Sequence, residues 1–219
     1  MILGRKKVIF SNLQTYKTVF NFKELINFLN NVGNTEINQK TFKLLKQDRV
    51  LFLGNFEEKL ENYFKSKFFN DNDKLKQYEL SYFQFATSLV FSKDVYAITN
   101  SINKISKIYE EAKTKKTSHA FWYPYAVSTR IFNILILIGK CHEMKISQNI
   151  ILKLNEIMHC DFEYLKENIE YDSDGNHLLK NYMSLSLASF FLKNKLKENY
   201  FKSLENLLSN QIISESGCH

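Results

Sequence analysis

The chain has 219 residues, of which 44% are hydrophobic and 15% aromatic, and it contains one proline and six glycines. This composition provides enough apolar surface for a packed core and excludes an intrinsically disordered chain, while so few turn-forming residues argue against an all-β fold. The formal charge of +7 at pH 7 would suit an acidic partner such as nucleic acid, anionic lipid or an acidic polysaccharide. The lysines are nevertheless scattered apart from a cluster at 113–116, so charge does not choose among these partners.

Helical periodicity recurs along the chain, with apolar residues three, four, seven or eight positions apart. Phe56, Leu60 and Phe64 mark one such face, and Ser147 is a suitable N-cap for a later apolar stripe. The connections are short and polar, as at 70–73 and 171–175, and none has the length of an interdomain linker. We therefore expect an all-α fold: one helical domain over residues 1–219, built as a continuous array of antiparallel helix pairs. The predicted helices span residues 22–31, 38–46, 55–69, 74–91, 93–113, 124–142, 147–168, 176–194 and 198–213.

The cysteine pattern and the N-terminal segment argue against a disulfide-bonded, zinc-binding or secreted chain. Cys141, Cys160 and Cys218 are odd in number and lack paired spacing, which fits neither a disulfide framework nor a zinc site. Apolar residues 8–10 are followed at once by polar ones, so no signal-peptide core develops. The longest apolar run, 131–139, is far shorter than the ~20 residues of a membrane span. We expect a cytoplasmic chain that spans no membrane.

Motifs for most enzyme classes are absent from the sequence. It contains no glycine-rich phosphate loop, no His-x-x-x-His or paired-cysteine metal spacing, and no Gly-x-Ser-x-Gly nucleophile turn. His159-Cys160-Asp161 superficially suggests a cluster, but adjacent helical positions point in different directions. We therefore expect no metal and no cofactor.

The segment 121–133 combines aromatic residues with a helix start. Phe-Trp-Tyr-Pro-Tyr at 121–125 precedes Arg130 and Asn133. The aromatic rings and the arginine could form a wall that stacks on a sugar and binds an acid. Equally, the segment could be a proline-initiated buried helix with an interfacial tryptophan.

Asn176 and His177 stand at the start of a strongly apolar helix, directly after an Asp-Gly pair. A helix start offers unpaired backbone N–H groups and the positive end of the helix dipole, so an anionic group such as a sugar carboxylate would be stabilised there. Asp, Gly and Asn are also ordinary helix-start residues, and a histidine in the first turn is often simply exposed. The pair by itself leaves both interpretations open.

Three separated segments occur in the same order as motifs of the bacterial heparinase II/III-like family. They are 74–83, 122–133 and 175–181, and the terminal Gly217-Cys218-His219 resembles the family's Asp-Gly-Gly-His turn. The resemblance extends from about residue 70 to the end of the chain. Ser81 departs from it, because the family usually has histidine there, and Cys218 replaces a glycine.

The resemblance implies an incomplete α/α toroid, normally followed by more helices and a β-sandwich domain. Lyases of the family cleave uronic-acid polymers by β-elimination, in which donors neutralise the uronate carboxylate and thereby stabilise an enolate-like transition state. Asn176 matches the asparagine with that role, and His177 matches the adjacent histidine that acts as a base or substrate contact. By the same resemblance, the sugar-binding residues would be Trp122, Tyr125, Arg130, Tyr82 and His219.

The chain as given stops at His219, before the tyrosine that serves the family as proton donor. We therefore expect little or no lyase activity from this polypeptide alone, with the remainder of the enzyme as a partner chain and an acidic polysaccharide or oligosaccharide as ligand. An alternative is a non-catalytic helical module that binds acidic glycan or a partner chain. A third interpretation, a basic helical-repeat protein that binds nucleic acid, would require the lysines to share one face.

Overall fold

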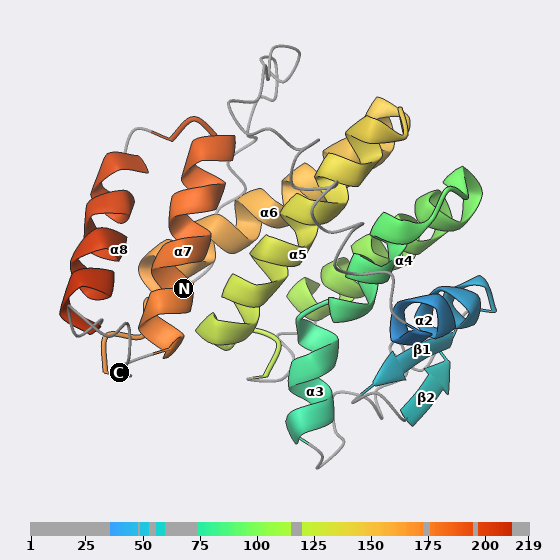
Figure 1. The fold of residues 1–219 in the computed structure, drawn as a ribbon, viewed down its shortest axis with the longest axis horizontal. Coiled ribbons are helices and arrows are strands. Elements are labelled where there is room, and N and C mark those ends of the chain that lie inside the picture. Colours follow the sequence, from blue (N-terminus) through green and yellow to red (C-terminus); the bar gives the residue numbers. More distant parts are fainter. Residues whose placement is uncertain are drawn as a thin grey trace.

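A computed structural model describes residues 36–47, 49–52, 56–59, 74–114, 120–172, 176–194 and 197–211. This part of the chain is predominantly helical, as expected for an all-α protein, with one short two-stranded sheet at its N-terminal side (Figure 1). The predicted helix 22–31 lies outside the described residues. The elements are α2 (Glu36–Lys46), β1 (Arg49–Phe52), β2 (Phe56–Lys59), α3 (Lys74–Ser81), the 3-10 helix η3 (Gln84–Phe91), α4 (Val95–Thr114), α5 (Pro124–Glu143), α6 (Gln148–Glu167), α7 (Asn176–Phe191) and α8 (Lys197–Gln211).

Helices α5 to α8 follow the predicted ranges closely and pack as consecutive neighbours. Helix α6 returns along α5, and α8 returns along α7, while α5 also packs against α7 and α6 against α4 (Figure 1). The start of α5 follows from the sequence, since Pro124 occupies the first turn after an extended Tyr123. The start of α4 is capped by Asp94, whose Oδ1 accepts the backbone N–H of Ala97 at 3.0 Å.

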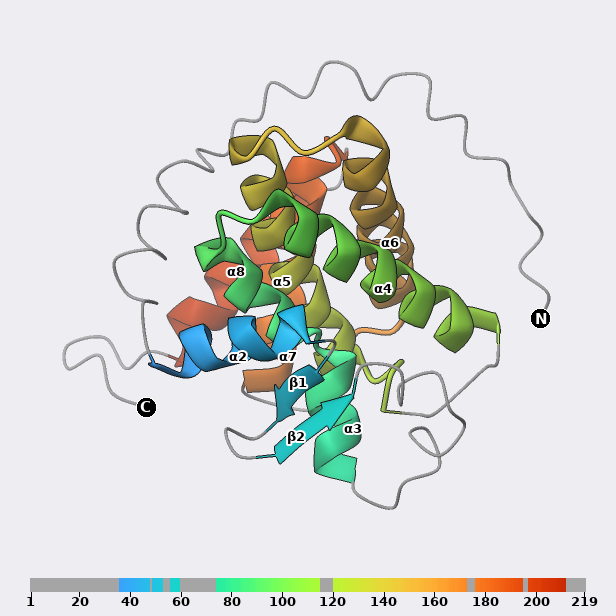
Figure 2. The same cartoon turned by 90° about the vertical axis from the view of Figure 1, so that its right-hand side faces the viewer.

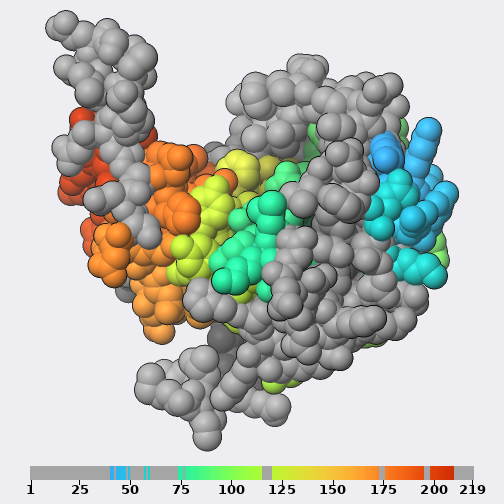
Figure 3. Space-filling model, turned by 90° about the horizontal axis from the view of Figure 1, so that it is seen from below, coloured from blue at the N-terminus to red at the C-terminus, as the bar shows by residue number. Residues whose placement is uncertain are grey.

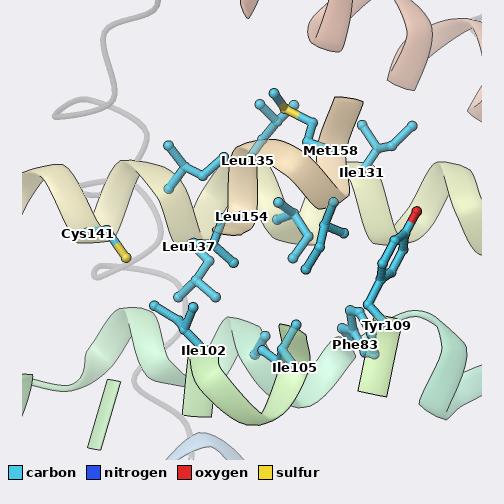
Figure 4. Packing of buried hydrophobic residues seen from close by; sticks show 14 of the residues in the cluster. Phe83, Ile102, Ile105, Tyr109, Ile131, Leu135, Leu137, Cys141, Leu154 and Met158 are labelled. Atoms are coloured by element: carbon cyan, nitrogen blue, oxygen red, sulfur yellow. The ribbon is translucent and has the colours of Figure 1, made fainter. Parts of the chain in front are cut away.

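One continuous apolar core joins these helices. Figure 4 shows Ile102 and Ile105 of α4 facing Leu137 of α5 and Leu154 of α6, all of them buried. The apolar stripes read from the sequence therefore supply the core, and burial of this surface is the main force that holds the helices together. Among the described residues, no helix is long and apolar enough to cross a membrane.

The prediction of a helix over residues 55–69 is wrong at its beginning. Residues 56–59 form strand β2, which pairs antiparallel with β1 in the register Arg49↔Lys59 to Phe52↔Phe56. Glu57 of β2 forms ion pairs with Arg49 at 3.0 Å and with Lys40 of α2 at 3.3 Å, and α2 packs on β1 (Figure 2). Spacing alone could not exclude a helix, but the Gly54-Asn55 pair between the strands is a hairpin signal.

The predicted single helix 74–91 is broken in the middle. Phe83 has a left-handed backbone (φ 53°, ψ 34°) that ends α3 and starts η3. This conformation costs a non-glycine residue roughly 1–3 kcal/mol, and the fully buried phenyl ring, packed against Phe85 and Phe121, offsets that cost. The break leaves Tyr82 at the turn between α3 and η3, close to the start of α5.

Candidate functional site

Three segments that are far apart in the sequence meet at one face of the molecule: the end of α3, the start of α5 and the start of α7. The ring of Tyr82, after α3, lies 6.0 Å from that of Tyr125, at the start of α5, and the Tyr125 ring lies 4.6 Å from the imidazole of His177 in the first turn of α7. Figure 3 shows α3, the start of α5 and α7 next to one another on this face. Residues separated by more than ninety positions in the sequence therefore form one group of rings, roughly within the range of aromatic pair contacts.

Further polar residues complete this group. Tyr123 packs edge-on against His177 with ring centroids 6.0 Å apart, and the Lys180 ammonium lies 5.6 Å from the centre of the Tyr125 ring. Glu170, in the segment between α6 and α7, contacts His177. We call this set the tyrosine–histidine cluster; it comprises Tyr82, Tyr123, Tyr125, Glu170, His177 and Lys180.

Hydrogen bonds from α5 hold the backbone beneath Tyr82 and before Tyr123. Asn133 Nδ2 donates to the carbonyl of Tyr82 at 2.8 Å. Arg130 Nη1 donates to the carbonyls of Ser81 at 2.9 Å and Phe121 at 3.0 Å. Arg130 and Asn133 thus hold in place the backbone of the two segments that carry Tyr82 and Tyr123.

A second set of hydrogen bonds attaches α7 to α5. The fully buried Asn181 donates through Nδ2 to Ser128 Oγ at 3.0 Å, and Ser184 Oγ donates to the Ser128 carbonyl at 2.8 Å. Asn181 Oδ1 also accepts the backbone N–H of Glu170 at 3.0 Å. Buried polar groups with satisfied partners fix a single arrangement, so His177 and Glu170 have a defined position relative to α5.

The charge state of the cluster follows from burial and from Glu170. Burial raises the pKa of Tyr82 to about 12. The hydrogen bond to Glu170, reinforced by burial, raises the pKa of Tyr123 to about 12. Burial lowers the pKa of Lys180. Both tyrosines are therefore neutral phenols at neutral pH, able to donate hydrogen bonds but unsuited to act as bases.

The prediction that Arg130 binds sugar is wrong. Its side chain is fully buried, with Nε 2.7 Å from Asp161 Oδ2 and Nη2 2.8 Å from Asp161 Oδ1. Tyr109 donates a further hydrogen bond to Asp161 at 2.8 Å, and the guanidinium lies 4.1 Å from the centre of the Phe121 ring. Burial opposes the charge on Arg130, but Asp161 outweighs it and the pKa of Arg130 is raised. The arginine is therefore a structural cation.

Trp122 also faces the core more than the cluster. Its ring packs at 5.2 Å from both Phe121 and Tyr164 and at 5.9 Å from Tyr109, and its carbonyl accepts a hydrogen bond from the Tyr164 hydroxyl. These contacts favour the interfacial tryptophan of a proline-initiated helix over a sugar-stacking wall.

The two remaining predicted site residues have different outcomes. Asn176 is the first residue of α7 and is exposed beside His177. His219 lies outside the described residues. Of the predicted site residues, Tyr82, Tyr125 and His177 lie in the cluster, and Asn176 directly precedes His177 in α7.

Sequence reasoning missed three members of the cluster. Lys180 follows His177 by three positions, a spacing that places two side chains on the same helix face. Tyr123 lies within the aromatic segment that could form a sugar-stacking wall, but it was not named individually as a site residue. Glu170 offered no local signal, because it precedes α7 and lies seven positions before His177.

The described residues contain no group of three or more histidine, cysteine or acidic side chains that could hold a metal ion. The comparison of the chain with protein-family models, characterised proteins and solved structures finds no match.

Proposed function

We propose that the tyrosine–histidine cluster binds the uronate unit of an acidic polysaccharide, and that the chain is the helical part of a heparinase II/III-like lyase. One observation supports this above all others: Tyr82, Tyr125 and His177 come from the three separate motifs of the resemblance, and their rings lie in successive contact. In this proposal the helix pairs form part of an α/α toroid.

The chemistry of the cluster suits an anionic sugar. Aromatic faces stack on the apolar face of a sugar ring, Lys180 supplies a cation close to the Tyr125 ring, and neutral phenols donate hydrogen bonds. Asn176, exposed at the start of α7, offers an amide at the positive end of the helix dipole. These groups can neutralise a carboxylate, which is the requirement for making the adjacent sugar C–H acidic.

In the elimination itself, a base removes the proton at C5 and the C4–O bond breaks, its electron pair leaving with the glycosidic oxygen. A C4–C5 double bond forms, and the leaving oxygen takes up a proton. His177 is the member of the cluster suited to be the base, because a neutral imidazole accepts a proton near neutral pH. Tyr82 and Tyr123, whose pKa values are raised to about 12, are suited to donate hydrogen bonds to the sugar and not to protonate the leaving oxygen, which would take its proton from water.

The alternative is a module that binds acidic glycan without cleaving it, and it uses the same cluster. The nucleic-acid interpretation receives less support, because lysines on several elements are paired with acidic residues. Examples are Lys46 with Asp94 at 2.9 Å and Lys166 with Glu163 at 2.6 Å. Such mixed charge is typical of a solvated surface rather than of a basic binding stripe. The cytoplasmic location stays a prediction from the sequence.

The test is a calorimetric titration of the purified chain with uronic-acid oligosaccharides, using neutral glucose oligosaccharides of equal length as the control ligand. We expect binding of the acidic ligands only, and its loss in Tyr125→Ala. A matched variant, Tyr96→Ala, removes an exposed tyrosine on α4 and should bind normally. Ultraviolet absorbance of an unsaturated uronate detects cleavage; we expect little or none from this chain alone, and clear product formation would exclude the non-catalytic binding module. Equal affinity for acidic and neutral ligands, or none for either, would refute the proposal.

A further inference from the structure

We propose that Glu170 is a positioning residue that holds His177 in one tautomer, with the proton on Nδ1 and the lone pair on Nε2. The role of this lone pair as a base or substrate contact rests on the proposed function; the tautomer itself does not. His177 Nδ1 lies 3.2 Å from Glu170 Oε1. The Glu170 side chain is only 9% exposed, whereas that of His177 is 40% exposed. Glu170 is thus largely shielded from solvent, whereas His177 is accessible to a ligand.

Asn181 contacts both the main chain and the side chain of Glu170 and holds them in place. Asn181 accepts the Glu170 backbone N–H at 3.0 Å, and Asn181 Nδ2 lies 3.4 Å from Glu170 Oε2. Asn181 is itself fully buried and bonded to Ser128 of α5. The carboxylate therefore cannot follow His177 freely, and the imidazole must orient itself toward a rigid acceptor.

The donors around Glu170 determine which nitrogen of His177 carries the proton. An ionised carboxylate only accepts hydrogen bonds, so the neutral imidazole must present Nδ1–H to Oε1. The Tyr123 hydroxyl oxygen lies 3.5 Å from Nδ1, at the limit of a hydrogen bond, and Nδ1–H has no lone pair left to accept its proton. Tyr123 therefore donates to Glu170, in agreement with the raised pKa of its phenol.

This arrangement has a direct chemical use. With Nδ1–H engaged, Nε2 on the other side of the ring keeps its lone pair, and the carboxylate stabilises the imidazolium that forms if Nε2 takes a proton. A carboxylate that orients a histidine in this way is a recurring device in enzymes and metal sites. The same group would keep His177 aligned against the Tyr125 ring, 4.6 Å away.

Nuclear magnetic resonance of the full chain labelled at histidine tests the tautomer without any ligand. Ring ¹³C and ¹⁵N shifts of His177, assigned with a His177→Gln variant, should report Nδ1–H at a pH where the ring is neutral. In Glu170→Gln the amide can donate to Nδ1, so the population should move toward Nε2–H. Glu170→Asp should retain the wild-type tautomer in part, and Glu163→Gln, which removes a carboxylate paired with Lys166, should leave it unchanged.

A second variant separates Glu170 from Tyr123. Tyr123→Phe removes the hydroxyl near Nδ1 and should leave the Nδ1–H tautomer in place. An Nε2–H tautomer in the wild-type chain, or an unchanged tautomer in Glu170→Gln whose helical circular dichroism is intact, would overturn the proposal. For uronate oligosaccharides we expect Glu170→Gln to bind roughly fivefold more weakly, the value of about one hydrogen bond.

The outcomes distinguish this inference from the proposed function. If the tautomer responds as described but no uronate oligosaccharide binds, the positioning role stands and the proposed ligand is wrong. If the wild-type ring carries its proton on Nε2, the positioning role is wrong whatever the chain binds.

Discussion

Two acid–base pairs in this protein have opposite environments: one is completely buried, and the other includes a substantially exposed histidine. Arg130 and Asp161 are both completely buried and joined by two short contacts. His177 and Glu170 make a single contact at 3.2 Å, with the histidine substantially exposed. The buried pair has its charges satisfied entirely within the protein, whereas the exposed one keeps a ring nitrogen available. A polar motif residue therefore reveals its role only through its burial and partners.

The largest expected effect is the loss of the buried pair. Arg130→Met leaves the Asp161 carboxylate without its cation, and we expect destabilisation of about 3–5 kcal/mol. Urea unfolding followed by circular dichroism measures this change. The control is Lys166→Met, which removes one partner of a more exposed pair and should cost at most about 1 kcal/mol.

The double variant Arg130→Met with Asp161→Leu sharpens this prediction. It removes both charges and should regain part of the lost stability. Full recovery is not expected, because Arg130 also binds the carbonyls of Ser81 and Phe121. Equal stability of Arg130→Met and the Lys166→Met control would contradict the structural role of the buried pair.

An intermediate effect is expected where the two regions are linked through α5 and α7. Asn181→Ala removes an amide that joins Ser128 to Glu170, and buried groups left without partners cost about 1–3 kcal/mol. The same variant should release Glu170 and weaken uronate binding. Unfolding and ligand titration measure the two consequences on one sample; a loss of stability without any change at His177 would show that the regions are independent.

His177→Ala should differ from Arg130→Met in lowering ligand affinity while changing stability little. Because the ring is 40% exposed, we expect a stability change within about 1 kcal/mol. Uronate affinity should nevertheless fall by about tenfold, equivalent to about 1.4 kcal/mol. Paired unfolding and binding measurements test this dissociation, and a large stability loss with retained binding would assign His177 to structure instead.

The smallest effect concerns Asp94, an exposed N-cap outside both regions. Its pKa is lowered by the hydrogen bond from the Ala97 backbone and then by Lys46. The pKa of Asp94 in the folded chain lies below its unfolded value of about 4. The ionised Asp94 therefore stabilises the fold fully above about pH 4, and this stabilisation is lost as the pH falls through the folded pKa. Asp94→Asn keeps a capping oxygen but removes the charge. The free energy of unfolding of this variant should therefore change less than that of the wild-type chain between pH 5 and pH 2, roughly the range in which carboxylates titrate.

The success of the helix predictions has a local cause. Helices α4 to α8 arise from long segments without an internal proline and with apolar residues on one face, and both signals are contained in the sequence of each segment. Strand β2 was mistaken for a helix because its apolar spacing was read without the Gly54-Asn55 hairpin signal that lies between it and β1. The break at Phe83 was missed because only core packing of its ring compensates for the left-handed backbone.

The candidate site was predicted in part for the same reason. Tyr82, Tyr125 and His177 were named from motifs, and the structure brings these three together. Arg130 was placed with them because sequence alone gives no sign of Asp161, thirty-one positions away, as its partner. Glu170 was overlooked because it precedes α7, so helical spacing does not relate it to His177.

The sequence by itself determined the helical class, most helix boundaries and the segments rich in site residues, since each depends on periodicity or on end signals within a few turns. Only the tertiary structure decided which polar residues are buried and which are accessible. That division depends on contacts between residues far apart in the chain, where desolvation makes an unpartnered charge costly and selects a partner for it. Arg130 became part of the buried framework, and His177, in contact with Glu170, remained 40% exposed.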